Sequence, residues 1–156
     1  MIRASVITVS DRSATGERED LAGPAIVAQL SSAGWDVDLR VVPDGSASVA
    51  AALRAALTGG ARLILTTGGT GIAPRDETPE GTREVIDREI PGIGEALRAL
   101  GSSAPGALLS RSLAGSSGDA LIVNLPGSPR AVAESMPLIL RVAPHALAQL
   151  SGEDHT

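Results

Sequence analysis

Short apolar segments that alternate with helical ones constrain the fold of this chain more than any other feature. Segments 61–65 and 120–124 are short and mainly apolar, which is typical of strands covered on both faces. Strands are also predicted over 2–9 and 35–42, and helices over 19–33, from Ser46 or Ser48 to 57, and over 78–89, 93–100 and 128–150. The alternation predicts a three-layer α/β/α sandwich around a mainly parallel sheet.

The chain length and composition predict one domain over 1–150, followed by a flexible tail over 151–156. No apolar run approaches the ~18–20 residues of a membrane span, so no membrane partner is expected. The N-terminus enters a strand pattern directly and there is no cysteine, so a cytoplasmic location is expected and thiolate metal sites are excluded.

The charged residues exclude several other classes of protein. The net charge of −5 argues against a general nucleic-acid binder. All 13 basic residues are arginine, which excludes a Walker-type phosphate lysine and any lysyl intermediate. Trp35 is the only aromatic residue, so a planar ligand would be held by apolar side chains and backbone.

A glycine-rich run follows the segment 61–65 and leads into a predicted helix. It contains Thr67, Gly68, Gly69, Thr70 and Gly71, and Asp76 comes shortly after them. Glycines let backbone N–H groups approach a phosphate closely. The aspartate would hold a divalent metal ion beside that phosphate. Two structural alternatives stand: a tight connection between strand and helix, and an aspartate that caps the helix or pairs with its neighbour.

Four polar loops follow the predicted parallel strands, and ligands bind beyond the carboxyl ends of such strands. We therefore expect these loops to meet at one edge of the sheet, although they are far apart in the sequence. Each also has an ordinary explanation, as a turn, a surface ion pair between Asp11 and Arg12, or a helix N-cap at Ser128. Besides the glycine-rich run, the loops contribute Ser10, Asp11, Asp44, Pro126, Gly127 and Ser128.

These motifs together carry a family resemblance. The run Thr-Thr-Gly-Gly-Thr-Gly, followed by Arg75-Asp76-x-Thr78-Pro79, resembles the signature of the MogA/MoaB-type molybdopterin-binding family of molybdenum cofactor biosynthesis. Further segments agree in the same order along nearly the whole chain: Val9-Ser10-Asp11-Arg12 with Gly16 and Asp20, Val42-Pro43-Asp44, Leu109-Ser110-Arg111, Ala114-Gly115, and the run from Leu121 to Pro129.

The resemblance implies a fold of the molybdopterin-binding-domain type and a molybdopterin adenylyltransferase, which uses ATP and Mg²⁺ and releases pyrophosphate. Asp44 and Asp76 match the acidic positions of the family and are the expected catalytic and metal-binding residues. Ser110, Gly127 and Ser128 would lie near the pterin phosphate or the adenylyl group. The resemblance also implies a homotrimer and hand-over of the product to a molybdenum-insertion protein.

Two other functions of the same fold stay open. A non-catalytic carrier would bind molybdopterin without turnover, and the presence of both Asp44 and Asp76 favours the enzyme over it. A nucleotide diphosphate hydrolase is the other alternative. The short chain and the loop Leu125-Pro126-Gly127-Ser128-Pro129 weigh against the hydrolase.

Overall fold

The computed structural model describes residues 1–101 and 103–153, so the end of the predicted tail, 154–156, lies outside the described residues. Six strands form one sheet in the order β2-β1-β3-β6-β5-β4. The first four strands in this order are parallel, and at one edge β5 pairs antiparallel with both β6 and β4. The strands are β1 (Arg3–Val9), β2 (Asp36–Val42), β3 (Leu63–Thr67), β4 (Arg88–Glu89), β5 (Ala114–Ser117) and β6 (Ala120–Leu125).

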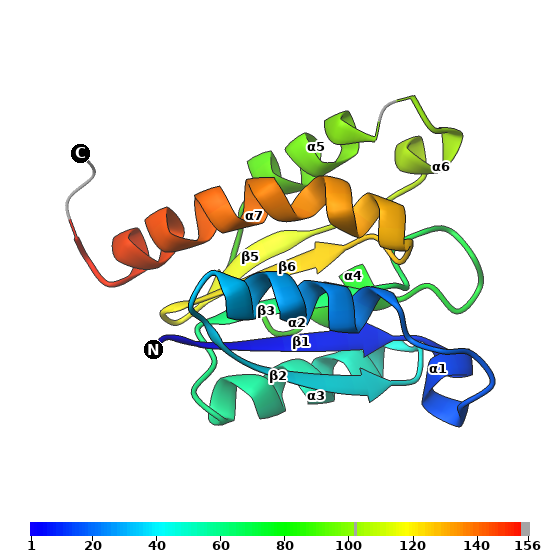
Figure 1. Cartoon of the computed structure of the whole chain (residues 1–156), viewed down its shortest axis with the longest axis horizontal. Coiled ribbons are helices and arrows are strands. Elements are labelled where there is room, and N and C mark those ends of the chain that lie inside the picture. The colour runs from blue at the N-terminus through cyan, green and yellow to red at the C-terminus, as the bar shows by residue number, and fades with distance from the viewer. Residues whose placement is uncertain (102, 154–156) are drawn as a thin grey trace.

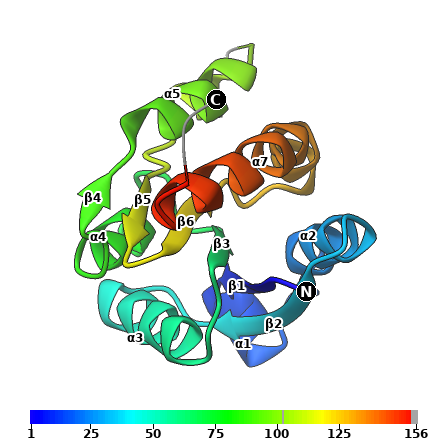
Figure 2. The ribbon, with the colours of Figure 1, turned by 90° about the vertical axis from the view of Figure 1, so that its left-hand side faces the viewer.

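Helices cover both faces of this sheet, which confirms the three-layer sandwich (Figure 1). Seen along the strands, α2, α5 and α7 lie on one side, and α3 and α4 lie on the other (Figure 2). The helices are α1 (Asp11–Thr15), α2 (Ala22–Ser32), α3 (Ser46–Thr58), α4 (Thr78–Arg83), α5 (Pro91–Leu100), α6 (Pro105–Leu108) and α7 (Pro129–Leu150).

The alternating side chains of the central strands divide the core into two clusters. Val6 and Leu65 pack with α2 and α7, whereas Ile7 and Ile64 pack with α3 on the opposite face. All of β3 and β6 is buried, as expected of strands between two helical layers. Core packing on both faces therefore fixes where β3 and β6 end, and with them the loops that follow.

The prediction of a helix over 78–89 is wrong in its second half. Helix α4 ends at Arg83, and Arg88–Glu89 instead pairs antiparallel with β5. The sequence of β5, Ala-Gly-Ser-Ser, lacks the apolar alternation that marks a strand, so it was not predicted. Gly115 lets the two strands approach, because a Cβ there would meet the carbonyl oxygen of Arg88 at 2.5 Å.

Helix α3 begins at Ser46, one of the two predicted starts, but neither Ser46 nor Ser48 caps it. Gly45 precedes α3 as its N-cap, with no side-chain cap, and Ser48 instead donates its hydroxyl to the carbonyl of Pro43 at 2.8 Å. Helix α7 runs unbroken over 22 residues through Pro137 and Pro144. Both prolines are exposed, so the carbonyls that lose a helical partner lie on the solvent side. No helix within the described residues is long and apolar enough to cross a membrane.

Candidate active site

The loops that follow β1, β2, β3 and β6 meet at one edge of the sheet, as their parallel direction requires. Backbone hydrogen bonds join them: Ser10 donates to the carbonyl of Val42 at 2.9 Å, and Gly68 donates to that of Leu125 at 3.3 Å. The hydroxyl of Thr67 adds a bond of 2.6 Å to the carbonyl of Pro126. Segments up to 59 residues apart thus form one continuous surface.

A pocket of about 370 Å³ opens between these loops, and we call it the acidic pocket. It contains the glycines that follow β3 and carboxylates from three different loops. Its walls include Ser10, Asp20, Asp44, Gly68, Gly69, Asp76, Gly127 and Ser128. Five residues predicted for the site are not among these walls: Asp11, Thr70, Gly71, Ser110 and Pro126. The carboxylate of Asp11 is bound by an arginine instead.

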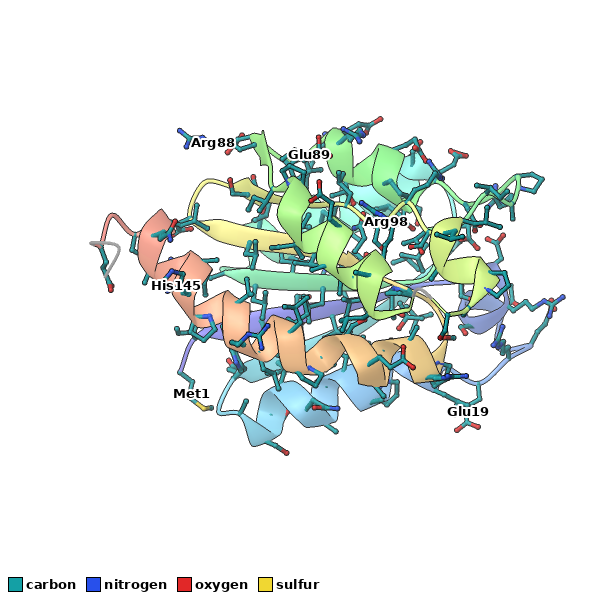
Figure 3. The ribbon with its side chains drawn as sticks, turned by 90° about the horizontal axis from the view of Figure 1, so that it is seen from above. Met1, Glu19, Arg88, Glu89, Arg98 and His145 are labelled. Atoms are coloured by element: carbon teal, nitrogen blue, oxygen red, sulfur yellow. The ribbon has the colours of Figure 1, made fainter. Side chains whose placement is uncertain are left out.

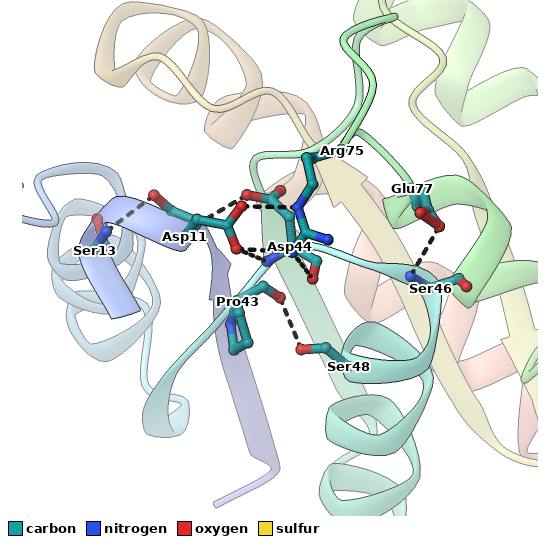
Figure 4. A network of polar contacts seen from close by, with 9 residues as sticks. Asp11, Ser13, Pro43, Asp44, Ser46, Ser48, Arg75 and Glu77 are labelled. Atoms are coloured by element: carbon teal, nitrogen blue, oxygen red, sulfur yellow. Dashed lines mark hydrogen bonds and ion pairs between the residues drawn. The ribbon is translucent and has the colours of Figure 1, made fainter. Parts of the chain in front are cut away.

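Asp11, Asp44 and Arg75 form an interlocked cluster beside the acidic pocket (Figure 4). The backbone N–H of Asp11 donates to Asp44 Oδ2 at 3.0 Å, and that of Asp44 donates to Asp11 Oδ1 at 3.1 Å. Arg75 donates to both carboxylate oxygens of Asp11 at 3.0 Å and to the carbonyl of Asp44 at 3.0 Å. Asp11 therefore pairs with Arg75 rather than with its sequence neighbour, and it aligns Asp44.

The two aspartates of this cluster have opposite electrostatic environments. Hydrogen bonding from Arg75, the largest effect, lowers the pKa of Asp11. Burial, the largest effect on Asp44, raises the pKa of that carboxyl, and the negative charges of Asp11 and Asp76 raise it further. A cation placed beside Asp44 would relieve this repulsion, whereas Asp11 already has its counter-charge.

Asp44 and Asp76 are each held by one carboxylate oxygen. Oδ2 of Asp76 accepts the backbone N–H of Ala73 at 3.0 Å, and Oδ2 of Asp44 is bound by Asp11. Within the described residues, Oδ1 of neither aspartate accepts a hydrogen bond from the protein. Mg²⁺ typically binds one or two carboxylates and takes its other ligands from phosphate and water. This donor set fits such an ion, and no group of three metal-binding side chains occurs in 1–101 and 103–153.

The glycines after β3 are required by their surroundings. Gly68 and Gly69 have φ of 99° and 68°, a region that favours glycine. A Cβ on Gly68 would overlap the carbonyl oxygen of Val9. Within the described part of the chain, the N–H groups of Gly69, Thr70, Gly71 and Ile72 donate to no protein acceptor. A run of free N–H groups of this kind can bind an anion.

A second pocket of about 340 Å³ lies beside the first, with Gly127 and Ser128 in the walls of both. The predicted residues Thr70, Gly71, Ser110 and Pro126 line this second pocket. Its remaining walls come mainly from α5, α6 and α7, and they include Leu97, Leu100, Ala107, Arg98 and Arg130. The glycine-rich loop therefore crosses from one pocket to the other.

Two residues of the shared region have defined local roles. Ser128 accepts the N–H of Ala131 at 3.1 Å and caps α7, so the positive end of a 22-residue helix faces both pockets. Arg98, on α5 (Figure 3), donates Nη1 to the carbonyl of Ser112 at 2.9 Å. Cap and cation together favour an anionic ligand at the boundary between the pockets.

Sequence reasoning did not find the roles of Arg75 and Arg111, although both belong to the motifs quoted above. Arg111 donates to the carbonyls of Gly71 and Asp76 at 2.9 and 2.8 Å, and to Glu80 at 2.6 Å. Their partners lie 31 to 64 residues away, so no local spacing marks them. The only signal in the sequence is that arginine occurs inside polar loops.

The fold and the site define an α/β domain with a pocket at the carboxyl edge of its sheet whose groups suit an anionic ligand. A family model described as a probable molybdopterin binding domain matches residues 5–145, and the chain belongs to this MogA/MoaB-type family. Among its relatives, a molybdopterin adenylyltransferase from Pyrococcus furiosus is 40% identical over 91% of this chain and 87% of its own length.

Two further comparisons agree. A molybdenum cofactor biosynthesis bifunctional protein from Synechococcus elongatus is 44% identical over 97% of this chain, and the chain spans about half of that relative (48%). The crystal structure of the molybdopterin biosynthesis enzyme MoaB from Thermus thermophilus superimposes with a TM-score of 0.89, at 45% identity and with all of both chains covered. The likeness thus extends over the whole described fold.

Proposed function

We propose that this protein is a molybdopterin adenylyltransferase of molybdenum cofactor biosynthesis that uses Mg-ATP and releases pyrophosphate. The observation that carries the proposal is the meeting of two pockets at one set of phosphate-binding groups. The N–H groups of the glycine-rich loop that have no acceptor in 1–101 and 103–153 lie there beside Asp44 and Asp76, each with one carboxylate oxygen that accepts no bond from those residues. The names of the relatives support the reaction.

In this reaction an oxygen of the molybdopterin phosphate attacks the α-phosphorus of ATP. A new P–O–P linkage forms, the bond from the α-phosphorus to its bridging oxygen breaks, and pyrophosphate leaves. Both substrates are anions, so alignment and charge neutralisation are the main tasks. Mg²⁺, held by Asp44 and Asp76, would neutralise the phosphate charge.

The chain's own groups divide these tasks between the pockets. The acidic pocket suits the metal-bound triphosphate, because a carboxylate pair attracts phosphate only through a cation. The second pocket, with Leu97 and Leu100 as well as Arg98 and Arg130 among its walls, suits an anionic ligand with a planar ring system. Gly127 and Ser128 would contact both substrates where the phosphates meet.

The test is pyrophosphate release from Mg-ATP, measured with and without molybdopterin. Release that requires molybdopterin is the expected result. Binding of molybdopterin without release of pyrophosphate would indicate a non-catalytic carrier of the same fold. Release of AMP from a dinucleotide without molybdopterin would make the protein a hydrolase.

The family resemblance also leads us to infer a homotrimer that acts in the cytoplasm and passes its product to a molybdenum-insertion protein. Light scattering on the purified protein measures the assembly, and a mass of one or two chains would contradict the trimer. Transfer of adenylylated molybdopterin to an insertion protein, followed in a two-protein assay, tests the hand-over.

A further inference from the structure

The glycine-rich loop is held by its carbonyl groups. Four successive carbonyls, of Gly68, Gly69, Thr70 and Gly71, all accept hydrogen bonds from only two residues. Thr78 binds the first two, through its hydroxyl at 2.9 Å and its backbone N–H at 3.1 Å. Arg111 binds the other two, through its backbone N–H at 2.7 Å and its Nε at 2.9 Å.

Peptide geometry gives these bonds a consequence on the opposite side of the loop. In a trans peptide the C=O and the next residue's N–H point in opposite directions, and the described chain has no cis peptide. Each held carbonyl therefore turns one N–H away from Thr78 or Arg111. The four N–H groups concerned, of residues 69 to 72, are the ones that donate to no protein acceptor in the described residues.

Thr78 and Arg111 are themselves firmly placed. Thr78 is fully buried, and its carbonyl accepts the hydroxyl of Thr82 at 2.9 Å. Thr82 in turn accepts a bond of 2.9 Å from Asn124 of β6. The guanidinium of Arg111 also binds Glu80 and the carbonyl of Asp76, and its hydrogen bond to Glu80 raises the pKa of Arg111. These bonds anchor the loop to α4 and to β6.

We propose that Thr78 and Arg111 are positioning residues that preset the backbone N–H groups of Gly69 to Ile72 as a phosphate cradle. The inference rests on the proposed function, because it names the groups that orient its phosphate site. Neither residue needs to touch substrate. The hydroxyl and N–H of Thr78 and the N–H and Nε of Arg111 are already bound to protein carbonyls. This distinguishes the two residues from side chains that bind phosphate directly.

The test compares the affinity for pyrophosphate in the presence of Mg²⁺ among matched variants. Thr78→Val keeps the shape and the backbone N–H but removes the bond to Gly68. Arg111→Gln removes the bond to Gly71 together with those to Glu80 and to the carbonyl of Asp76. Both should bind pyrophosphate about tenfold or more weakly, the effect expected from a lost hydrogen bond to a charged group. Thr78→Ser restores a hydroxyl and should restore most of the affinity.

Two controls separate positioning from general damage. Ser5→Ala removes a different buried hydroxyl, which donates to Asp38, and Arg83→Gln removes a different exposed arginine pair, with Glu89. Both should bind pyrophosphate as the unmodified protein does. Melting temperatures of all variants show whether a loss of affinity is a loss of fold, and Arg111→Gln, half-exposed, should stay folded.

Amide resonances give a readout that a purely structural role would not move selectively. Pyrophosphate should shift the amide signals of residues 69 to 72 in the unmodified protein. Thr78→Val should reduce the shift of the Gly69 amide most, because that N–H is in the same peptide unit as the carbonyl that loses its bond. For the same reason, Arg111→Gln should reduce the shift of Ile72 most. Equal shifts and equal affinity in folded variants would overturn the proposal.

The outcomes also separate this proposal from the proposed function. If the unmodified protein binds neither Mg-ATP nor pyrophosphate, both fail. If it binds pyrophosphate and the variants bind equally well, only the positioning role fails. If the variants lose affinity but the unmodified protein never releases pyrophosphate from ATP, the cradle stands and the adenylyl transfer fails.

Discussion

The acidic pocket and the second pocket share a wall but are built differently. The acidic pocket is formed by loops at the carboxyl ends of parallel strands, and hydrogen bonds to backbone groups fix its carboxylates. The second pocket takes half of its walls from three helices and includes buried Leu97. The difference indicates that the acidic pocket suits the charged metal and phosphate groups, and that the second pocket suits the body of a ligand by its shape.

The largest expected effect comes from removing charge in the acidic pocket. Asp44→Asn or Asp76→Asn should each lower kcat by about 10²–10³-fold, the usual result of losing one preorganised electrostatic group. Folding should be intact, because Asn can still accept the backbone bond that holds each side chain. Molybdopterin-dependent pyrophosphate release is the measurement.

Asp36→Asn is the matched control, because Asp36 is an exposed partner of Arg3 far from the pockets. It should leave turnover unchanged. Normal pyrophosphate release by both site variants would end the assignment of a metal to this pocket, and with it the contrast between the two pockets.

The next effect concerns the backbone on which both pockets depend. Gly68→Ala should destabilise the protein by about 2–4 kcal/mol, because the new Cβ is strained at positive φ and overlaps the immobile carbonyl of Val9. Denaturant unfolding measures the loss. Gly92→Ala, where a Cβ would meet nothing within 4 Å, should be close to neutral, and equal midpoints for the two variants would contradict the expectation.

The acidic pocket could be predicted from the sequence largely because it depends on local patterns. Apolar segments mark the strands, parallel strands end at one edge, and Asp44 and Asp76 follow two of those ends. Asp11 was placed correctly at this edge, but its pairing with Arg75 was not predicted, since 64 residues separate the two. A spacing rule has no access to such a contact.

The helical walls of the second pocket were much less predictable. Segment 107–113 has no clear period, and α6 is only four residues long. Strand β5 does not line this pocket but was missed as well: its sequence, Ala-Gly-Ser-Ser, has no apolar alternation, and its pairing with β6 and β4 determines it. Where tertiary packing overrides local preference in this way, the sequence pattern does not predict the element.

A variant in the second pocket should sharpen the contrast. Arg98→Gln should raise KM for molybdopterin about fivefold to tenfold, the range of one charge-assisted hydrogen bond, and leave kcat and the Mg²⁺ dependence unchanged. Steady-state kinetics with each substrate varied in turn measures this. Arg141→Gln, which removes an exposed arginine of α7 outside both pockets, is the control and should leave this KM unchanged. A changed Mg²⁺ dependence in Arg98→Gln would show that metal binding and molybdopterin binding are not assigned to separate pockets.

The smallest expected effect is on the melting temperature, which should change in opposite directions in Asp44→Asn and Asp11→Asn. Burial raises the pKa of Asp44, so the folded protein holds that proton more tightly than the unfolded chain. Ionised Asp44 therefore destabilises the folded protein once the pH rises above 3.8, the ordinary pKa of an aspartate. Asp44→Asn should raise the melting temperature by up to a few degrees at neutral pH in Mg²⁺-free buffer, although it lowers kcat.

Asp11 should behave in the opposite way. Arg75 lowers its pKa, so its stabilising effect is present above 3.8 and is lost as the pH falls through the lower folded value. Asp11→Asn should therefore lower the melting temperature at neutral pH, and both differences from the unmodified protein should vanish in acid. Melting curves from neutral to strongly acidic pH measure this, with Asp36→Asn as the reference. If Asp44→Asn melts at a lower temperature than the unmodified protein at neutral pH, the ionised carboxylate of Asp44 stabilises the fold. Burial and repulsion would then give no reason to expect a cation beside it.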